Sequence, residues 1–304
     1  MRTPIPLPKY PCTFGTLLDL DRFRRETDNC QIMRRFLLIA FLLFSSISAW
    51  AKGENRVVVT IPPQAEFVER VGGERVKVSV MVPPGASPHT YEPTPRQLME
   101  VSRAKIYVMV GSGVEFEIAW MDKIRRLNRK MLIVDSSKGV KIIDKDPHIW
   151  LSPRNAEVMV ENIYEGLLKV DPAHKEYYRA NKERYISQLH ALHQEIARSL
   201  KGKRKRRFMV FHPSWRYFAE EYGLEQIPIE REGKEPTPRE MLALIQQAKR
   251  EGIKVIFASP EFNVKGAEAI AKEIGGKVLL ISPLERNYLD NMRRLLQALQ
   301  EALK

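Results

Sequence analysis

Short apolar runs alternate with helix-type patterns along the first half of the chain, and this alternation predicts parallel β-strands joined by helices. Four runs rich in β-branched residues are expected to be strands, at 56–61, 76–82, 106–110 and 131–134. Amphipathic stretches between them predict helices, at 64–71 and 95–102. Because most of these runs are apolar on both faces, we expect a parallel sheet covered by helices on both sides.

The last hundred residues repeat the same alternation. The expected strands are 208–211, 254–257 and 277–281, and the expected helices are 215–222, 238–250, 265–274 and 289–303. The chain therefore has the pattern of an α/β protein with two similar lobes, each with a parallel sheet. Ligands of open α/β sheets bind beyond the carboxyl ends of the strands, so a site is expected in the cleft between the lobes.

The segment between the lobes has a helical pattern. Apolar residues recur at helical spacing from Val158 to Leu167 and again from Tyr185 to Ile196, with Asp171-Pro172 between the two stretches. A proline inside a helical pattern kinks or ends the helix. We predict an N-terminal lobe at 52–152, a long rigid connecting helix at 153–202 that is kinked near Pro172, and a C-terminal lobe at 203–304.

The first 51 residues are not expected to belong to the fold. Met33-Arg34-Arg35 is followed by the apolar run 36–44 and then by small residues up to Ala51, which is the pattern of a secretory signal peptide at 33–51. A membrane-spanning helix needs about 20 apolar residues, so a membrane anchor is the weaker interpretation, as is a buried helix. Residues 1–32 are predicted to be a spurious or disordered extension.

The composition and the cysteine count give further information on the class of protein and on its redox environment. The 304 residues carry a formal net charge of +13, are 44% hydrophobic and 29% charged, and contain two cysteines. This is a globular composition. Cys12 and Cys30 both precede the predicted cleavage site, so the mature chain is expected to have no disulfide and no thiolate ligand. Since no cysteine ends the apolar run, we expect no lipid anchor, and an exported protein.

The six histidines form two groups. Three lie in the helical segment, at His174, His190 and His193. The last two are three residues apart and share a helix face that suits a surface metal, but a solvated face is the preferred interpretation. The other three, His89, His148 and His212, each lie in a loop at or near a strand end beside proline. Imidazole is a preferred ligand for borderline metals, so these three predict a metal site.

Four loops carry a family resemblance. They are PGASPHTYEPTP at 84–95, DPHIWLSP at 146–153, FHPSWRYFA at 211–219 and EPTP at 235–238. In order and spacing they resemble the ligand loops of zinc/manganese solute-binding proteins of ABC transporters, and the resemblance runs from about residue 56 to the C-terminus. It implies a C-clamp fold: two lobes, a rigid helical backbone and one metal ion in the interface.

The resemblance also implies the ligands. His89 and His148 of the N-terminal lobe and His212 of the C-terminal lobe match the family's positions. The family's fourth ligand is usually an aspartate in an L-D-P-L-like strand end, where this chain has Ser282. Glu261 is the first candidate to replace it and Glu230 a weaker one, although an ordinary surface carboxylate is the preferred interpretation of both. Water is the default fourth ligand. Glu92 and Asp146 lie near ligands in sequence, where each either orients a ring or caps a turn.

Three imidazoles with few oxygens favour Zn²⁺, with Mn²⁺ as the alternative. Many zinc-binding relatives have a histidine-rich loop between the first two ligands, and 113–147 contains no histidine. We expect a periplasmic, monomeric protein that captures the ion and delivers it to an ABC permease in the inner membrane. Metal affinity is expected to fall below about pH 6.5, where imidazoles are protonated.

Two other functions fit the sequence less well than transport. A His₃ zinc hydrolase needs a positioned base, and the chain has neither an H-E-x-x-H motif nor a G-x-S-x-G elbow. No enzymatic activity is therefore expected. The basic run 201–207 is a possible nucleic-acid contact. For an exported protein, a solvated turn or a contact with anionic lipid or the permease fits better, and no nucleic-acid partner is expected.

Overall fold

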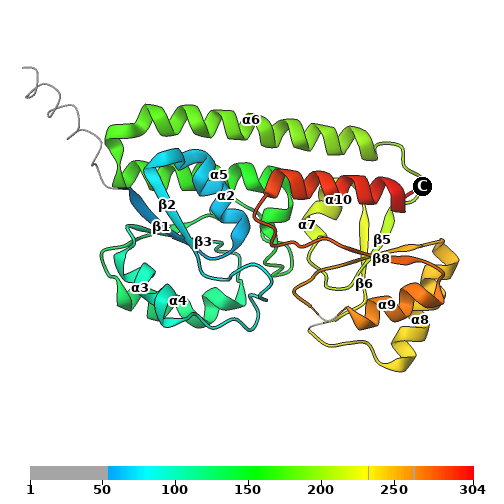
Figure 1. Cartoon of the computed structure of the whole chain (residues 1–304). Coiled ribbons are helices and arrows are strands. Elements are labelled where there is room, and N and C mark those ends of the chain that lie inside the picture. Colours follow the sequence, from blue (N-terminus) through cyan, green and yellow to red (C-terminus); the bar gives the residue numbers. More distant parts are fainter. Residues whose placement is uncertain (1–53, 232, 263) are drawn as a thin grey trace, which may run out of the picture. The chain divides into compact units, whose positions relative to one another are not determined.

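Two parallel four-stranded sheets, each flanked by helices, make up the described part of the chain (Figure 1). The computed structural model describes residues 54–304, except 232 and 263. The predicted extension at 1–32 and the predicted signal peptide at 33–51, with both cysteines, lie outside the described residues. Between 54 and 304, every helix is too short or too polar to span a membrane.

The N-terminal sheet has the order β2-β1-β3-β4. Its strands are β1 (Asn55–Val59), β2 (Val76–Val80), β3 (Ile106–Met109) and β4 (Leu132–Asp135). Its helices are α2 (Pro62–Gly72), α3 (Pro95–Arg103) and α4 (Glu115–Leu127), with α5 (Pro153–Val170) packed beside α2. The α2 and α5 helices cover one face of the sheet, and α3 and α4 lie on the other (Figure 1). Both faces are buried, as the apolar strands predicted.

The C-terminal sheet repeats this topology in the order β6-β5-β7-β8. Its strands are β5 (Arg207–Val210), β6 (Glu225–Pro228), β7 (Val255–Ala258) and β8 (Lys277–Leu280). Its helices are α7 (Arg216–Glu221), α8 (Pro238–Glu251), α9 (Lys265–Glu273) and α10 (Tyr288–Ala302). The α8 helix begins with a capping box, in which the Thr237 hydroxyl accepts from the Glu240 N–H and the Glu240 carboxylate accepts from Thr237.

The predicted kink near Pro172 is wrong, because the chain reverses direction there. Helix α5 ends at Val170, a 3₁₀ turn covers Pro172–His174, and α6 (Lys175–Leu200) runs back along α5. The antiparallel packing is shown by three pairs across the two helices: Arg154 with His193, Glu157 with His190, and Glu161 with Lys182. The Asp171 carboxylate accepts hydrogen bonds from Tyr178 and Asn55, which fixes the turn. Only α6 is therefore the long connecting helix.

One apolar core runs through both lobes and the helices between them. Helix α6 packs against α2 of the N-terminal lobe and against α10 of the C-terminal lobe. The Trp150 indole N–H donates to the Pro283 carbonyl at 2.8 Å, and the Tyr288 N–H donates to the Glu66 carboxylate at 2.5 Å. The predicted class, two parallel-sheet lobes on a rigid helix, is confirmed. The lobe boundaries at 52–152, 153–202 and 203–304 stay a prediction.

Two elements were missed from the sequence. Helix α4 alternates charged and apolar residues without an evident start, because its N-cap is Val114 and makes no side-chain cap. Strand β6 has four residues, ends at Pro228 and lies at the sheet edge, where only Ile227 of the four is buried. An edge strand loses little by lacking a donor at proline, so its sequence does not need to look like a central strand. Both elements border the site described next.

Candidate metal centre

His89 lies in the loop between β2 and α3. The loop turns at Gly85, whose φ of 80° is in the left-handed region. The His89 N–H donates to the Ser87 hydroxyl at 3.3 Å. The ring Nδ1 of His89 lies 2.9 Å from Oε1 of Glu115 in the first turn of α4. Glu115 therefore orients this ring. Its role could not be predicted from the sequence, because the helix that carries it, α4, was not predicted.

His148 lies in a turn that a residue of the other lobe holds in place. The Asp146 carboxylate accepts the His148 backbone N–H at 2.9 Å and lies 2.7 Å from the ring Nδ1. The Tyr217 hydroxyl of α7 donates to the Asp146 carbonyl at 2.9 Å and accepts from the Ile143 N–H at 3.0 Å. Of the two carboxylates considered from sequence, Asp146 contacts a histidine ring, whereas Glu92 is exposed.

His212 lies just beyond the carboxyl end of β5. The parallel register of β5 and β6 pairs Val210 with Pro228, and the Glu230 N–H continues it by donating to the Phe211 carbonyl at 2.9 Å. This register places Glu230 beside His212, with 3.2 Å between Oε1 of Glu230 and the ring Nδ1 of His212. Glu230, a weaker candidate for the fourth ligand, thus contacts a histidine ring.

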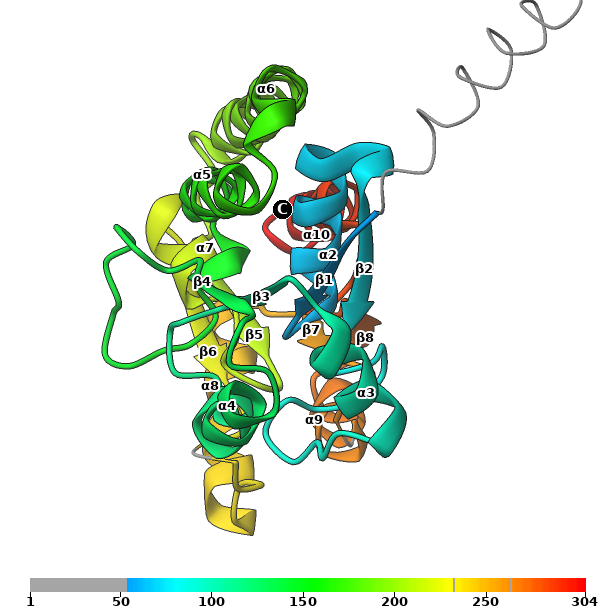
Figure 2. The ribbon, with the colours of Figure 1, turned by 90° about the vertical axis from the view of Figure 1, so that its left-hand side faces the viewer.

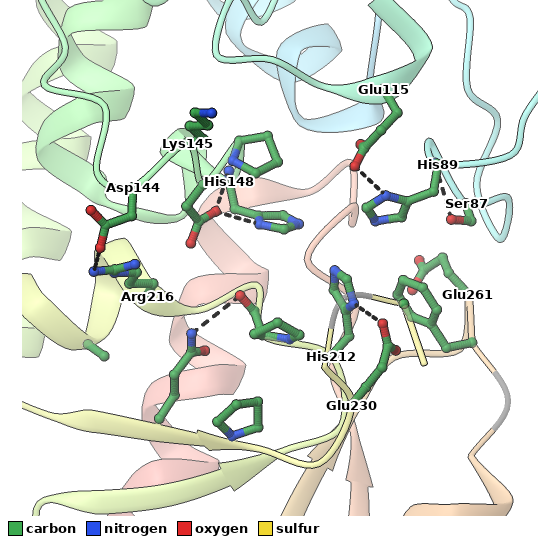
Figure 3. A pocket seen from close by; sticks show the side chains of 18 of the residues that line it. Ser87, His89, Glu115, Asp144, Lys145, His148, His212, Arg216, Glu230 and Glu261 are labelled. Carbon is green, nitrogen blue, oxygen red and sulfur yellow. Dashed lines mark hydrogen bonds and ion pairs between the residues drawn. The ribbon is translucent and has the colours of Figure 1, made fainter. Parts of the chain in front are cut away.

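The structure brings the three rings together from distant parts of the chain (Figure 3). One ring nitrogen from each of His89, His148 and His212 lies within 4.8 Å of the others. The His212 ring centroid is 5.1 Å from that of His89 and 5.3 Å from that of His148. Tetrahedral zinc with bonds of about 2.0–2.1 Å holds its ligands about 3.4 Å apart, so small ring rotations suffice to close the site.

Each of these rings has its Nδ1 beside a carboxylate. An ionised carboxylate only accepts hydrogen bonds, so Nδ1 carries the proton and Nε2 presents its lone pair. In the described part of the chain, the buried Nε2 of His212 has no hydrogen-bond partner. A buried polar atom without a partner is costly, and a bound cation would satisfy it. The donor set therefore fits a divalent metal ion.

The pKa shift of His212 favours its neutral imidazole. Burial lowers the pKa of His212; Glu230 acts against this, while His148 and His89 reinforce it. Partial burial acts to raise the pKa of Glu115, but the hydrogen bond from His89 and the nearby imidazoles outweigh it, so the pKa is lowered. His212 therefore stays neutral, and able to bind metal, to a lower pH than a free imidazole does.

Glu261 lies in the same pocket, and two serines bind its carboxylate. The Ser259 and Ser282 hydroxyls donate to it, one to each oxygen. Burial raises the pKa of Glu261, although the hydrogen bond from Ser282 acts in the opposite direction. The group of described side chains within 4.8 Å of one another contains the three histidines and not Glu261. Ser282, which stands at the position of the family's usual aspartate ligand, thus donates a hydrogen bond to Glu261, the first candidate for the fourth ligand.

The pocket around the rings is acidic, although the chain is basic. It has a volume of about 1080 Å³ and is lined from both lobes. Seven of its lining residues are carboxylates, Glu115, Asp144, Asp146, Glu220, Glu225, Glu230 and Glu261, against the two cations Lys145 and Arg216. The chain as a whole carries +13. A cleft lined by one sign of charge raises the local concentration of the opposite ion, which here is a cation.

Comparison with known proteins identifies the family. The family model ZnuA, described as zinc-uptake complex component A periplasmic, matches residues 57–302. The chain belongs to the ZnuA family. This is a family of solute-binding transport proteins, as the loops at 84–95, 146–153 and 211–219 predicted. The family is described as periplasmic, which is an extracytoplasmic location.

Proteins similar to this chain include zinc proteins. The chain is 30% identical to the high-affinity zinc uptake system protein ZnuA of Bacillus subtilis, over 88% of this chain and 94% of that protein. It is 27% identical to the zinc-binding protein AdcA of Streptococcus pyogenes serotype M3, over 88% of this chain but 61% of AdcA. The crystal structure of a ZnuA deletion mutant with zinc bound is 40% identical, with a TM-score of 0.79, over 83% of this chain and 99% of that one.

The remaining histidines of this ZnuA-family chain lie away from the centre. His190 has a side chain that is 59% exposed, as a solvated face requires. For His193 that prediction is wrong, because its side chain is 11% exposed. Its Nδ1 lies 2.7 Å from Glu221 of α7, and its Nε2 accepts from Arg154 of α5 at 3.2 Å. The helical pattern could not show that α5 folds back onto this face and buries it.

Proposed function

We propose that this chain captures Zn²⁺ between its two lobes, with His89, His148 and His212 as ligands, and delivers it to an ABC permease in the cytoplasmic membrane. One observation carries the proposal: three imidazoles from both lobes converge, each with its Nδ1 beside a carboxylate. Membership of a zinc-uptake family and a zinc-bound relative support the choice of ion. We also propose that the protein is exported through a signal peptide at 33–51 and acts as a monomer in the periplasm.

The chemistry is binding and release, with no covalent step. Neutral imidazole nitrogen suits zinc, whereas Mn²⁺ prefers more oxygen ligands. The carboxylates at Nδ1 fix each ring and raise its basicity. Because two ligands come from one lobe and one from the other, the ion binds most tightly to one lobe arrangement, and a small rotation at the permease weakens it. The acidic lining of the pocket raises the encounter rate with cations.

We propose no catalytic role for the centre. A zinc hydrolase needs a general base within reach of a metal-bound water. The described carboxylates nearest the rings are occupied, because Glu115, Asp146 and Glu230 bind Nδ1 atoms and Glu261 binds two serines. Transport binding accounts for each of these contacts.

Metal competition tests the function. Protein stripped with a chelator would be titrated calorimetrically with ZnCl₂ and with MnCl₂, and the metal content of untreated protein would be measured by elemental analysis. Tight zinc binding at one site, with zinc displacing manganese, is the expected result. A folded protein that gives no zinc heat would overturn the proposal, and displacement of zinc by equimolar manganese would assign the other metal.

The Glu230→Gln variant is expected to lower zinc affinity about 10- to 100-fold, as the loss of outer-shell partners typically does. The amide cannot stabilise the protonated Nδ1 as an ionised carboxylate does, so ring orientation and basicity both suffer. Glu225→Gln is the matched control, since Glu225 lines the same pocket but pairs with Arg207. Calorimetric titration of both variants makes the comparison, and equal affinities would exclude a role for Glu230.

The Glu261→Gln variant tests the fourth position. If water completes the coordination, as we propose, this change leaves zinc affinity within about threefold, because the carboxylate is bound by Ser259 and Ser282. If Glu261 leaves the serines to bind the ion, a loss of about 100-fold is expected, the share of one ligand in a zinc site. X-ray absorption spectra of the zinc-loaded wild type and variant would show whether one oxygen ligand changes.

A further inference from the structure

A basic face lies at the end of the N-terminal lobe, far from the connecting helix. It is formed by α4, the turn after it and the end of α3, and its cations are Arg103, Lys123, Arg125, Arg126, Arg129 and Lys130. All are exposed, and none forms an ion pair with a described carboxylate. The Asn128 amide donates to the Val101, Ser102 and Ala104 carbonyls, which joins the end of α4 to the end of α3. We call this surface the α3–α4 face.

Apolar side chains are exposed among these cations. Ile118 on α4 is 75% exposed, Met99 on α3 is 52% exposed and Leu127 at the end of α4 is 46% exposed. The Lys123 ammonium lies 4.5 Å from the centroid of the Trp120 ring, which is half-buried. Cations interspersed with exposed aliphatic and indole groups are the composition of helices that lie at a membrane–water interface.

The position of this face suits a flat partner. Figures 1 and 2 both place α3 and α4 at the opposite end of the N-terminal lobe from α6. The C-terminal end of α4 carries Lys123, Arg125 and Arg126, and Arg129 and Lys130 follow in the turn after it. Charge spread in this way gains from a continuous anionic surface.

The cations of the other basic segment, 201–207, are mostly engaged in ion pairs and hydrogen bonds within the protein. Arg207 pairs with Glu225 and Glu251, and Arg206 donates to the Leu200 and Tyr222 carbonyls. Lys203 and Lys205 also donate to backbone carbonyls. These side chains neutralise carboxylates and helix ends, which is a structural use of the charge. Lys201 and Arg204 are left as exposed cations of this run without a described ion-pair partner.

We propose that the α3–α4 face binds anionic phospholipid headgroups, with Ile118 entering the interface beside Arg125 and Arg126, which lie on the same side of α4. The first turn of α4 holds Glu115, which contacts His89, so the face and the metal centre share one helix. Membrane contact through this helix keeps the binding protein next to the surface in which a permease lies. The proposal stands apart from metal capture, because it depends on charge and exposure alone.

Vesicle sedimentation tests the proposal. The purified protein would be mixed with phosphatidylcholine vesicles and with vesicles that also contain phosphatidylglycerol, at low and high salt. Binding to the anionic vesicles only, weakened by salt, is expected. Each Lys or Arg near an anionic surface contributes about a fivefold factor in partition, so Arg125→Gln/Arg126→Gln should weaken binding about 25-fold.

A charge-matched control separates this face from net charge. Lys201→Gln/Arg204→Gln removes the same charge from the other end of the molecule and should leave partition nearly unchanged. Failure of the wild type to bind anionic vesicles overturns the proposal, as does equal loss in the two double variants. Both variants should bind zinc as the wild type does in calorimetry. A failure of zinc binding would therefore defeat the proposed function without affecting the vesicle result.

Discussion

The His212→Ala variant is expected to lower zinc affinity by at least about a hundredfold. Structural zinc sites gain roughly 10–16 kcal/mol from four ligands, so one ligand corresponds to about 3 kcal/mol, or about two powers of ten in affinity. Alanine also removes the ligand that the C-terminal lobe supplies, so the ion would no longer join the two lobes. Competition against a chromophoric chelator measures the affinities of the variant and the wild type.

The control for this variant is His190→Ala, because His190 is exposed on α6 and outside the cluster. His193 is unsuitable, since it is buried against Glu221 and Arg154 and its loss would disturb the junction of α5, α6 and α7. The control should bind zinc like the wild type. Equal affinities for His212→Ala and His190→Ala would remove His212 from the ligand set.

The second large effect is expected at Trp150, whose replacement by alanine should destabilise the protein by about 3–5 kcal/mol. The side chain is 1% exposed, and its indole N–H joins the N-terminal lobe to the Pro283 carbonyl of the C-terminal lobe at 2.8 Å. Truncation leaves a large cavity and an unpaired buried carbonyl. Urea unfolding followed by circular dichroism gives the free energy of unfolding of each variant.

Trp150→Phe separates the two contributions, because it keeps most of the packing and loses the hydrogen bond, for an expected cost of about 1–3 kcal/mol. Trp120→Phe is the matched control at a half-buried tryptophan of the same lobe and should cost less than about 1 kcal/mol. A Trp150→Phe variant as stable as this control would show that the contact with Pro283 contributes nothing to stability.

The periodicity of the sequence predicted every strand of the two sheets except the edge strand β6. Runs such as 106–110 are apolar on both faces, and only a doubly covered parallel sheet buries both. The reversal at Pro172 was not predictable in the same way, because proline after a helical stretch is compatible with a kink or with a turn. Which one occurs depends on tertiary contacts to Asp171, from Asn55 and Tyr178, that are distant in sequence.

The candidate site was also predictable only in part. The three histidines carry a local signal, since each lies next to a proline in a loop that follows a strand. Their carboxylate partners do not: Glu115 is 26 residues from His89 in a helix with no capping residue, and Glu230 reaches His212 only through the β5–β6 register. Asp146, two residues from His148, is the one partner that proximity in sequence suggested.

The contact between α2 and α10 has a consequence for how the protein matures. Glu66 and Phe67 near the start of the fold meet Tyr288, 222 positions later, through a hydrogen bond and an edge-to-face ring pair at 5.1 Å. The first helix of the fold is therefore completed by the last. Such a distant closure slows acquisition of the native state and leaves earlier intermediates exposing apolar surface until the final segment has been synthesised and docked.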